Sequence, residues 1–181
     1  MIISLLALMI MGFVNQPVGA SGLRSQNGEA SSHRFQVLDE FESEAVLDTV
    51  TGLVWERSPS TRETLWTSAP SLCALKSVGG RRGWRLPTFY ELMSLVDPAV
   101  QGQSSNPTLP RSNPFLDVKA STYWSVTSLS ADPFSAYAVD FSLGDVTSRR
   151  KSTTRGYWCV LSHSSSEEVR FNHSVHQSSW F

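Results

Sequence analysis

The segment that decides the fold is GWRLPTFYEL, residues 83–92. Thr88 followed three positions later by Glu91 forms a capping box, in which each side chain accepts a hydrogen bond from the other residue's backbone N–H. This pattern predicts a helix over residues 89–96, with its apolar residues buried. Arg85 is a candidate ion-pair partner of Glu91. The residues assigned to this structural motif are Trp84, Arg85, Leu86, Pro87, Thr88 and Glu91.

A second helix is expected upstream, over residues 66–75. Apolar residues recur there at positions 66, 69, 72, 73 and 75, which is a helical spacing. Pro70 would lie in the first turn, where its missing N–H costs little. Cys73 falls on the inward face of this helix. The glycine-rich stretch 79–83 then separates it from the capping-box helix.

Short strand patterns flank the two helices. Before them, the strand patterns are 35–38 and a hairpin of 45–48 with 53–57. Residues 97–120 form a long loop rich in Pro, Ser and Asn, and loops of that length are usually functional or poorly ordered. The strand patterns after the loop are 122–127, 136–141 turning into 146–148, and 157–160, which would close the sheet. The order strands, helices, strands predicts an α+β fold.

The two ends of the chain differ in composition from the middle. Residues 2–14 are an apolar run, too short to span a bilayer but typical of a secretory signal, with cleavage expected after Ala20. No Lys or Arg precedes the run, and a buried N-terminal helix is the alternative. The expected organisation is a signal peptide at 1–20, a linker at 21–33, one domain at 34–161 and a Ser/His-rich tail at 162–181. The protein is therefore expected to be exported, to the periplasm or beyond, without stable membrane insertion.

Export bears on the expected oxidation state of the only two cysteines, Cys73 and Cys159. In an oxidising compartment, two cysteines in one small domain are most simply a disulfide. Two free thiols, one of them reactive, are the alternative. The disulfide is the prediction.

Six segments in this order resemble the Lcl C-terminal domain family, a bacterial family of largely unknown function. The segments are TGLVWER (51–57), residues 66–73, GWRLPTFYEL (83–92), TYWSVT (122–127), FSLGDV (141–146) and YWCVL (157–161). The resemblance covers residues 34–161 and implies a C-type-lectin-like fold, related to formylglycine-generating enzymes. In that fold two helices pack on a small, mostly antiparallel sheet, and a long-range disulfide joins the helix to the last strand. The tail after Leu161 departs from the family pattern.

The domain offers little catalytic chemistry. Its residues include no histidine to serve as a base or a zinc ligand, because the histidines are His33, His163, His173 and His176. The cysteine chemistry of formylglycine-generating enzymes does not transfer if both cysteines form the disulfide. The acidic signatures of calcium-dependent lectins are missing from the long loop. We therefore expect no catalytic residue, no metal ion and no cofactor.

Charge provides the main functional signal. The net charge of −1 argues against a general nucleic-acid binder, but residues 70–161 carry 10 basic and 6 acidic side chains. The expected ligand-binding residues are Arg149, Arg150, Lys151 and Arg155, together with Trp124, whose position beside the long loop favours an exposed ring. A guanidinium suits sulfate and carboxylate groups. The plainer interpretation is a solvated basic loop and buried tryptophans.

Together these features predict an exported, monomeric, non-enzymatic binding module. Its expected partner is an acidic glycan or another polyanion at the cell envelope, bound by the loop at 97–120 and the basic run at 149–155. A protein of the envelope is the alternative partner. A carboxylate-dependent enzyme is the remaining alternative, and it would need two acids converging in a pocket.

Overall fold

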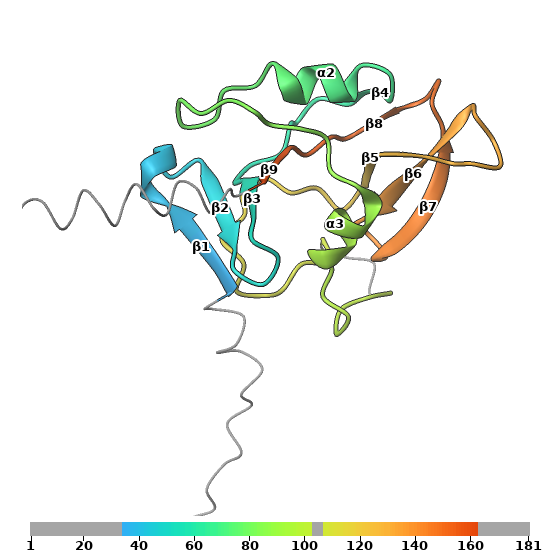
Figure 1. The fold of residues 1–181 in the computed structure, drawn as a ribbon. Coiled ribbons are helices and arrows are strands. Elements are labelled where there is room, and N and C mark those ends of the chain that lie inside the picture. Colours follow the sequence, from blue (N-terminus) through green and yellow to red (C-terminus); the bar gives the residue numbers. More distant parts are fainter. Residues whose placement is uncertain (1–33, 103–106, 163–181) are drawn as a thin grey trace, which may run out of the picture.

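The structure, a computed structural model, describes residues 34–102 and 107–162. Within these ranges the fold is mixed α+β, with two short α-helices and nine strands in three antiparallel sheets (Figure 1). The predicted fold class is confirmed. The predicted signal peptide and linker, and the tail after Ser162, lie outside the described residues.

The first sheet contains four strands in the order β1-β2-β3-β9. Its members are β1 (Phe35–Leu38), β2 (Ala45–Asp48), β3 (Leu53–Glu56) and β9 (Val160–Ser162), and a short 3-10 helix, η1 (Asp39–Phe41), joins β1 to β2. The predicted hairpin is confirmed as β2 and β3. Phe35 pairs with Asp48, Asp48 with Leu53, and Leu53 with Ser162, so these four residues form one row across the sheet. The start of β1 and the end of β9 therefore lie at the same end of the sheet, on its two opposite edges.

The other two sheets correct the prediction of a single sheet. They are β5 (Thr122–Ser128), β6 (Ser135–Asp140) and β7 (Asp145–Arg150), and the pair β4 (Thr64–Leu65) with β8 (Thr154–Arg155). The chain leaves one sheet for another after β8. Gly156 donates its N–H to the Thr122 carbonyl of β5, whereas the Cys159 carbonyl accepts the N–H of Glu56 on β3. Residues 157–159 therefore connect the sheets rather than extend one.

Both helices are shorter than predicted. They are α2 (Ala69–Ala74) and α3 (Phe89–Ser94), with Pro70 in the first turn of α2 as expected. Trp66 lies before α2, and its indole N–H donates to the Ser125 carbonyl of β5, 2.8 Å away. At the start of α3 the capping box is confirmed: the Glu91 N–H donates to the Thr88 hydroxyl at 3.2 Å, and the Thr88 N–H donates to the Glu91 carboxylate at 2.7 Å.

The predicted disulfide is confirmed. Cys73 of α2 and Cys159, just before β9, are bonded with their Cα atoms 5.5 Å apart, and both are fully buried. A disulfide indicates an oxidising environment outside the cytoplasm. Within the described ranges, no helix is long and apolar enough to cross a membrane.

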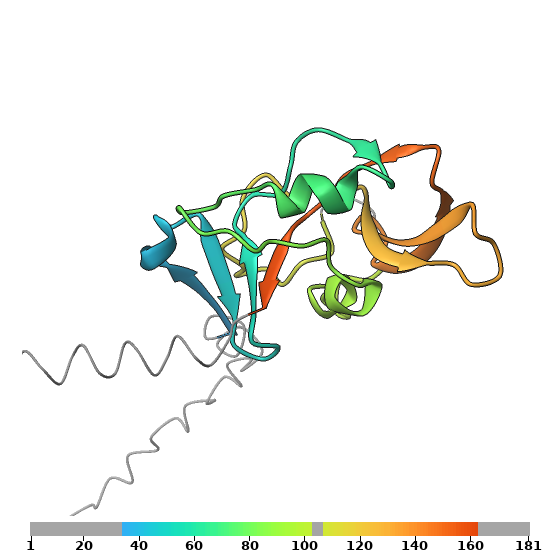
Figure 2. The same cartoon turned by 45° about the horizontal axis from the view of Figure 1, so that its top comes forward.

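The core consists of two clusters of buried side chains. One surrounds the disulfide and contains Trp84 and Trp124; the other is an aromatic cluster around Trp55 and Trp158, whose ring centroids lie 5.6 Å apart. Figure 2 shows α2 and α3 at different levels beside the curled β5-β6-β7 sheet. Of the two helices, α3 is the one that packs on all three strands of this sheet.

The Arg85–Glu91 ion pair leads to a prediction about pH. Burial opposes ionisation of Glu91, but the Arg85 guanidinium at 2.6 Å and the Thr88 groups outweigh it and lower the pKa of the carboxyl. A lowered pKa stabilises the fold above the ordinary carboxyl range, and this contribution is lost as the pH falls through the folded pKa. Glu91→Gln keeps a capping side chain but removes the charge. We expect it to cost about 1 kcal/mol of unfolding free energy at pH 7.

Urea unfolding at pH 7 and pH 3 measures this effect. The gap between wild type and Glu91→Gln should narrow at pH 3, and the exposed Glu40→Gln should show no gap at either pH. An equal loss at both pH values would contradict a role for the charge.

Candidate functional site

A groove at the far end of the β5-β6-β7 sheet contains two of the predicted ligand-binding residues. Its volume is about 390 Å³. One wall comes from β4 and the residues after it, the second from the β5–β6 turn, and the third from the end of β7. The lining residues are Leu65, Thr67, Pro133, Phe134, Arg150, Lys151 and Ser152.

Lys151 is held firmly in this groove. Its ammonium donates to the Ser128 hydroxyl and to the Pro133 carbonyl, both at 2.8 Å, and lies 4.1 Å from the centroid of the Trp66 ring. The backbone N–H of Lys151 donates to Phe134. A cation fixed in this way loses little side-chain entropy when it binds an anion.

The four cations of the basic run do not converge on one face. Arg149 and Arg150 are neighbours on β7, and successive side chains of a strand point to opposite faces. Arg149 donates to the Thr147 hydroxyl at 2.5 Å and to the Ser148 carbonyl. Arg155, on β8, donates to the carbonyl of Thr154. Arg150, which is exposed, and Lys151 are the two that line the groove.

Asp132 is the acidic neighbour of the groove. A hydrogen bond from the Ser135 hydroxyl, another from the Phe134 N–H, and the charges of Arg150 and Lys151 lower the pKa of its carboxyl. The two cations of the groove, Arg150 and Lys151, thus have one carboxylate beside them. This local excess of positive charge is smaller than the four-residue run predicts.

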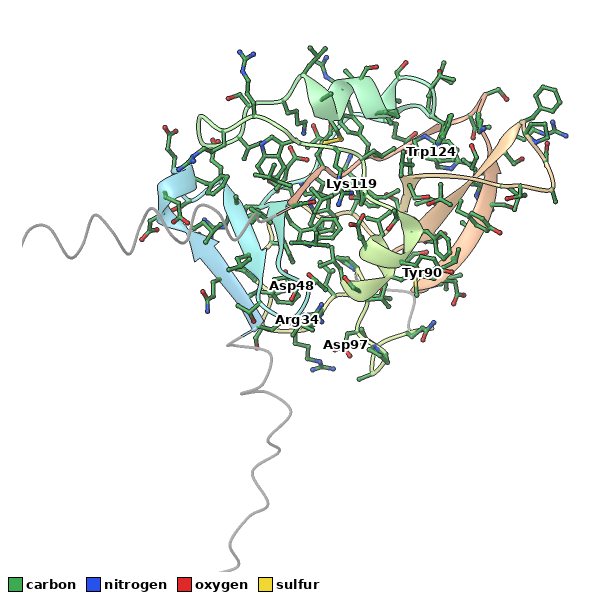
Figure 3. All side chains as sticks on the ribbon, in the orientation of Figure 1. Arg34, Asp48, Tyr90, Asp97, Lys119 and Trp124 are labelled. Atoms are coloured by element: carbon green, nitrogen blue, oxygen red, sulfur yellow. A yellow bond between two sulfur atoms is a disulfide. The ribbon has the colours of Figure 1, made fainter. Side chains whose placement is uncertain are left out.

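The prediction of an exposed Trp124 is wrong. The ring is fully buried, and its indole N–H donates to the Thr64 carbonyl at 2.9 Å. Figure 3 shows Trp124 inside the molecule, below α2. Because β4 covers this position, the ring packs in the core and offers no face to a sugar. Trp55, Trp84 and Trp158 are buried as well, in line with the plainer interpretation.

The first half of the long loop lies apart from the groove. Gly102 donates its N–H to Leu143 in the β6–β7 turn, and the buried Thr108 donates its N–H to Phe141. These contacts are at the start of β7, whereas Arg150 is at its end. Asp97, the first residue of the loop, lies at the lower edge of the domain in Figure 3. Arg81 also lies away from the groove, over the Phe41 ring, 5.4 Å from its centroid.

A second hollow, of about 360 Å³, contains a buried carboxylate that the sequence analysis missed. Its lining residues are Ser43, Glu44, Glu56, Arg57, Ser58, Val78 and Leu116. Glu56 is 3% exposed; it accepts hydrogen bonds from the Lys76 ammonium and, at 2.8 Å, from the Cys159 N–H. Burial raises the pKa of Glu56 despite these partners. A charged residue directly after Val54 and Trp55 in an apolar strand was the available signal.

The polar groups of this second hollow are already used by the fold. Arg57 donates to the carbonyls of Pro114 and Ser43, both at 3.1 Å. Glu56 is paired with Lys76. Across residues 34–102 and 107–162, no group of three or more His, Cys, Asp or Glu side chains is arranged to hold a metal ion. Lys151 of the groove is also bonded within the fold, but the exposed Arg150 beside it makes the groove the better candidate site.

Fold and site define a small, disulfide-bonded α+β domain with a shallow, partly basic groove. A family model for the Lcl C-terminal domain matches residues 44–161, and the chain belongs to the Lcl C-terminal domain family. The resemblance noted in the sequence is thereby confirmed. A search of curated proteins found no match.

Proposed function

We propose that this domain is an exported, non-enzymatic binding module that recognises acidic groups, most plainly those of an acidic glycan, through the groove beside Arg150 and Lys151. The observation that carries the proposal is the fixed ammonium of Lys151 next to the exposed guanidinium of Arg150. A guanidinium binds carboxylate and sulfate through two parallel hydrogen bonds. The disulfide supports export, because it requires an oxidising compartment.

The groove also supports a ligand larger than a single ion. Phe134 is 71% exposed and Leu65 is 40% exposed, so apolar surface lies directly beside the two cations. A sugar ring that carries a carboxylate or sulfate has an apolar C–H face and an anionic group together. This combination fits the groove better than an inorganic anion does.

Binding of a soluble sulfated or uronic-acid polysaccharide at two salt concentrations tests the proposal. Affinity should fall steeply between 50 mM and 500 mM NaCl, because salt screens exposed charges. The double variant Arg150→Gln/Lys151→Gln should bind at least tenfold more weakly at low salt. Arg111→Gln, which removes an exposed arginine outside the groove, is the matched control and should bind like wild type.

Two outcomes would overturn the proposal. One is an affinity that does not change with salt. The other is equal binding by the double variant and the Arg111→Gln control. Either result would assign the two cations to keeping the protein soluble.

A further inference from the structure

The strand β7 (Asp145–Arg150) is the open edge of the β5-β6-β7 sheet. On one side it pairs with β6 over its whole length. Among residues 34–102 and 107–162, no strand pairs with its other side. Figure 1 shows β7 along the margin of the domain, and four of its six residues are exposed. An open edge of this kind can pair with a further strand.

The hydrogen bonds between β6 and β7 determine which backbone groups face outward. The Lys151 N–H, just after β7, donates to the Phe134 carbonyl, just before β6. Hydrogen-bonded pairs alternate with non-bonded pairs along an antiparallel ladder, so every second residue back from Lys151 bonds to β6. The backbone N–H and C=O groups of Val146, Ser148 and Arg150 therefore point away from β6, toward the open edge.

The available part of this edge is its middle. At one end, the Thr153 N–H donates to the outward carbonyl of Arg150. At the other end, the Gln101 amide donates to the Gly144 carbonyl at 3.0 Å. Residues 145–149 lie between these two contacts, and we call them the open edge.

The charges of the open edge are complementary to those of a second copy. Its sequence is Asp-Val-Thr-Ser-Arg, with an acid at one end and a base at the other. A two-fold axis at Thr147 sets Asp145 opposite the partner's Arg149 on both sides of the axis, and it sets the outward groups of Val146 opposite those of the partner's Ser148. The Arg149 guanidinium already lies along the strand, because it donates to the Thr147 hydroxyl at 2.5 Å. Opposite charges that face each other across a strand pair stabilise the pair.

The neighbouring registers lack this match. Moving the axis to Ser148 sets Asp145 opposite the partner's Lys151, whose ammonium already donates to two groups of its own chain. Moving the axis to Val146 sets Arg149 opposite an uncharged residue of the partner's β6–β7 turn. Charges on an edge strand usually prevent pairing because they repel. Here the signs alternate in the one order that favours self-pairing about Thr147.

We propose that the open edge of β7 binds β7 of a second copy of this chain in antiparallel orientation, with Thr147 opposite the partner's Thr147. The pairing joins two three-stranded sheets into one of six strands. A contact of five residues on each strand is small beside the roughly 800 Å² that each partner buries in a stable interface, so the dimer is weak and forms at high protein concentration.

This dimer takes the place of the monomer expected from the sequence. Its pairing uses no contact of the Arg150 or Lys151 side chains, so it does not rest on the proposed recognition of acidic groups. Two grooves in one assembly would bind a long polymer with higher avidity than one groove does.

Sedimentation equilibrium of the oxidised chain between 10 µM and 500 µM, in 50 mM NaCl, tests the pairing. The average mass should rise from that of a monomer toward that of a dimer. Asp145→Arg and Arg149→Asp should each weaken dimerisation at least tenfold, because each sets like charges opposite each other twice. The combined variant Asp145→Arg/Arg149→Asp inverts both ion pairs and should return to within threefold of wild type. Arg111→Asp, a charge reversal at an exposed arginine outside β7, is the matched control and should dimerise like wild type.

A cysteine at the axis tests the register. Residues opposite each other in a non-hydrogen-bonded antiparallel pair have Cα atoms about 4.5 Å apart, which is within the range of a disulfide. Thr147→Cys should therefore form a disulfide-linked dimer under mild oxidation. Thr61→Cys introduces a cysteine at an exposed threonine elsewhere and should cross-link at least tenfold more slowly.

Three results would overturn the inference. They are a monomer at every concentration up to 500 µM, a combined charge variant that dimerises no better than the single ones, and equal rates of cross-linking in Thr147→Cys and Thr61→Cys. Because Asp145 and Arg111 are exposed, their replacement should leave the urea midpoint of unfolding unchanged.

Discussion

Replacing Cys73 and Cys159 together by alanine should lower the free energy of unfolding by about 4–5 kcal/mol. The bond closes a loop with a sequence separation of 86 residues, and such a link stabilises the fold by reducing the conformational entropy of the unfolded chain. This loss is a large part of the stability of an ordinary domain. Urea unfolding of the oxidised protein and the variant measures it.

Single substitutions sharpen this test. Cys73→Ala and Cys159→Ala each remove the same bond, so each should cost nearly as much as the double variant. Thiol titration of the wild type in urea should detect no free thiol, since both cysteines are bonded. Additive losses from the two single variants would show that the side chains contribute by packing instead of by the bond.

Replacing Glu56 by alanine should cost about 3 kcal/mol. The carboxylate accepts the buried N–H of Cys159 and the ammonium of Lys76, and alanine would leave both without their acceptor. Leaving a buried donor unpaired is more costly than the hydrogen bond itself is worth. Urea or thermal unfolding of Glu56→Ala measures the loss.

A conservative variant separates the two parts of this effect. Glu56→Gln retains an acceptor for the Cys159 N–H and removes only the charge that pairs with Lys76. We expect it to lose about 1 kcal/mol, less than half the loss of the alanine variant. If glutamine costs as much as alanine, the ion pair and not the backbone hydrogen bond is the important contact.

The parts of the fold that local chemistry determines were predictable from the sequence. The capping box at Thr88 and Glu91 depends on a spacing of three residues, and the α3 start follows it. Pro70 in the first turn of α2 is similarly local. The disulfide needed only a count of cysteines and the expectation of an oxidising compartment.

The parts that depend on distant contacts were not predictable. Trp124 is buried because Thr64, sixty positions earlier, passes over it and accepts its indole N–H. The role of Glu56 depends on Lys76 and Cys159, which lie 20 and 103 positions further along the chain. No local pattern in the sequence places these partners together.

The candidate site shows the same division. The basic run was visible as a run of charges, but which of its members share a surface depends on strand alternation along β7. The expectation of a shared basic surface did not allow for Arg149 and Arg150 being neighbours on a strand. The packing of Phe89 on Tyr137 was not predictable either, because the two rings meet only where α3 packs on β6.

The row that joins Phe35 to Ser162 determines how the domain would respond to tension. A pull on the two ends of the described chain loads β1 and β9 from the same end of the sheet, so strand pairs separate one at a time. The disulfide would stop this unravelling at Cys73 and Cys159, because the chain between them cannot lengthen. An oxidised domain then extends by about 150 Å, against about 450 Å for a reduced one. Arg150 and Lys151 stay inside the closed loop, whereas Leu65 and Thr67 lie outside it, so tension would pull one wall of the groove away from the two cations.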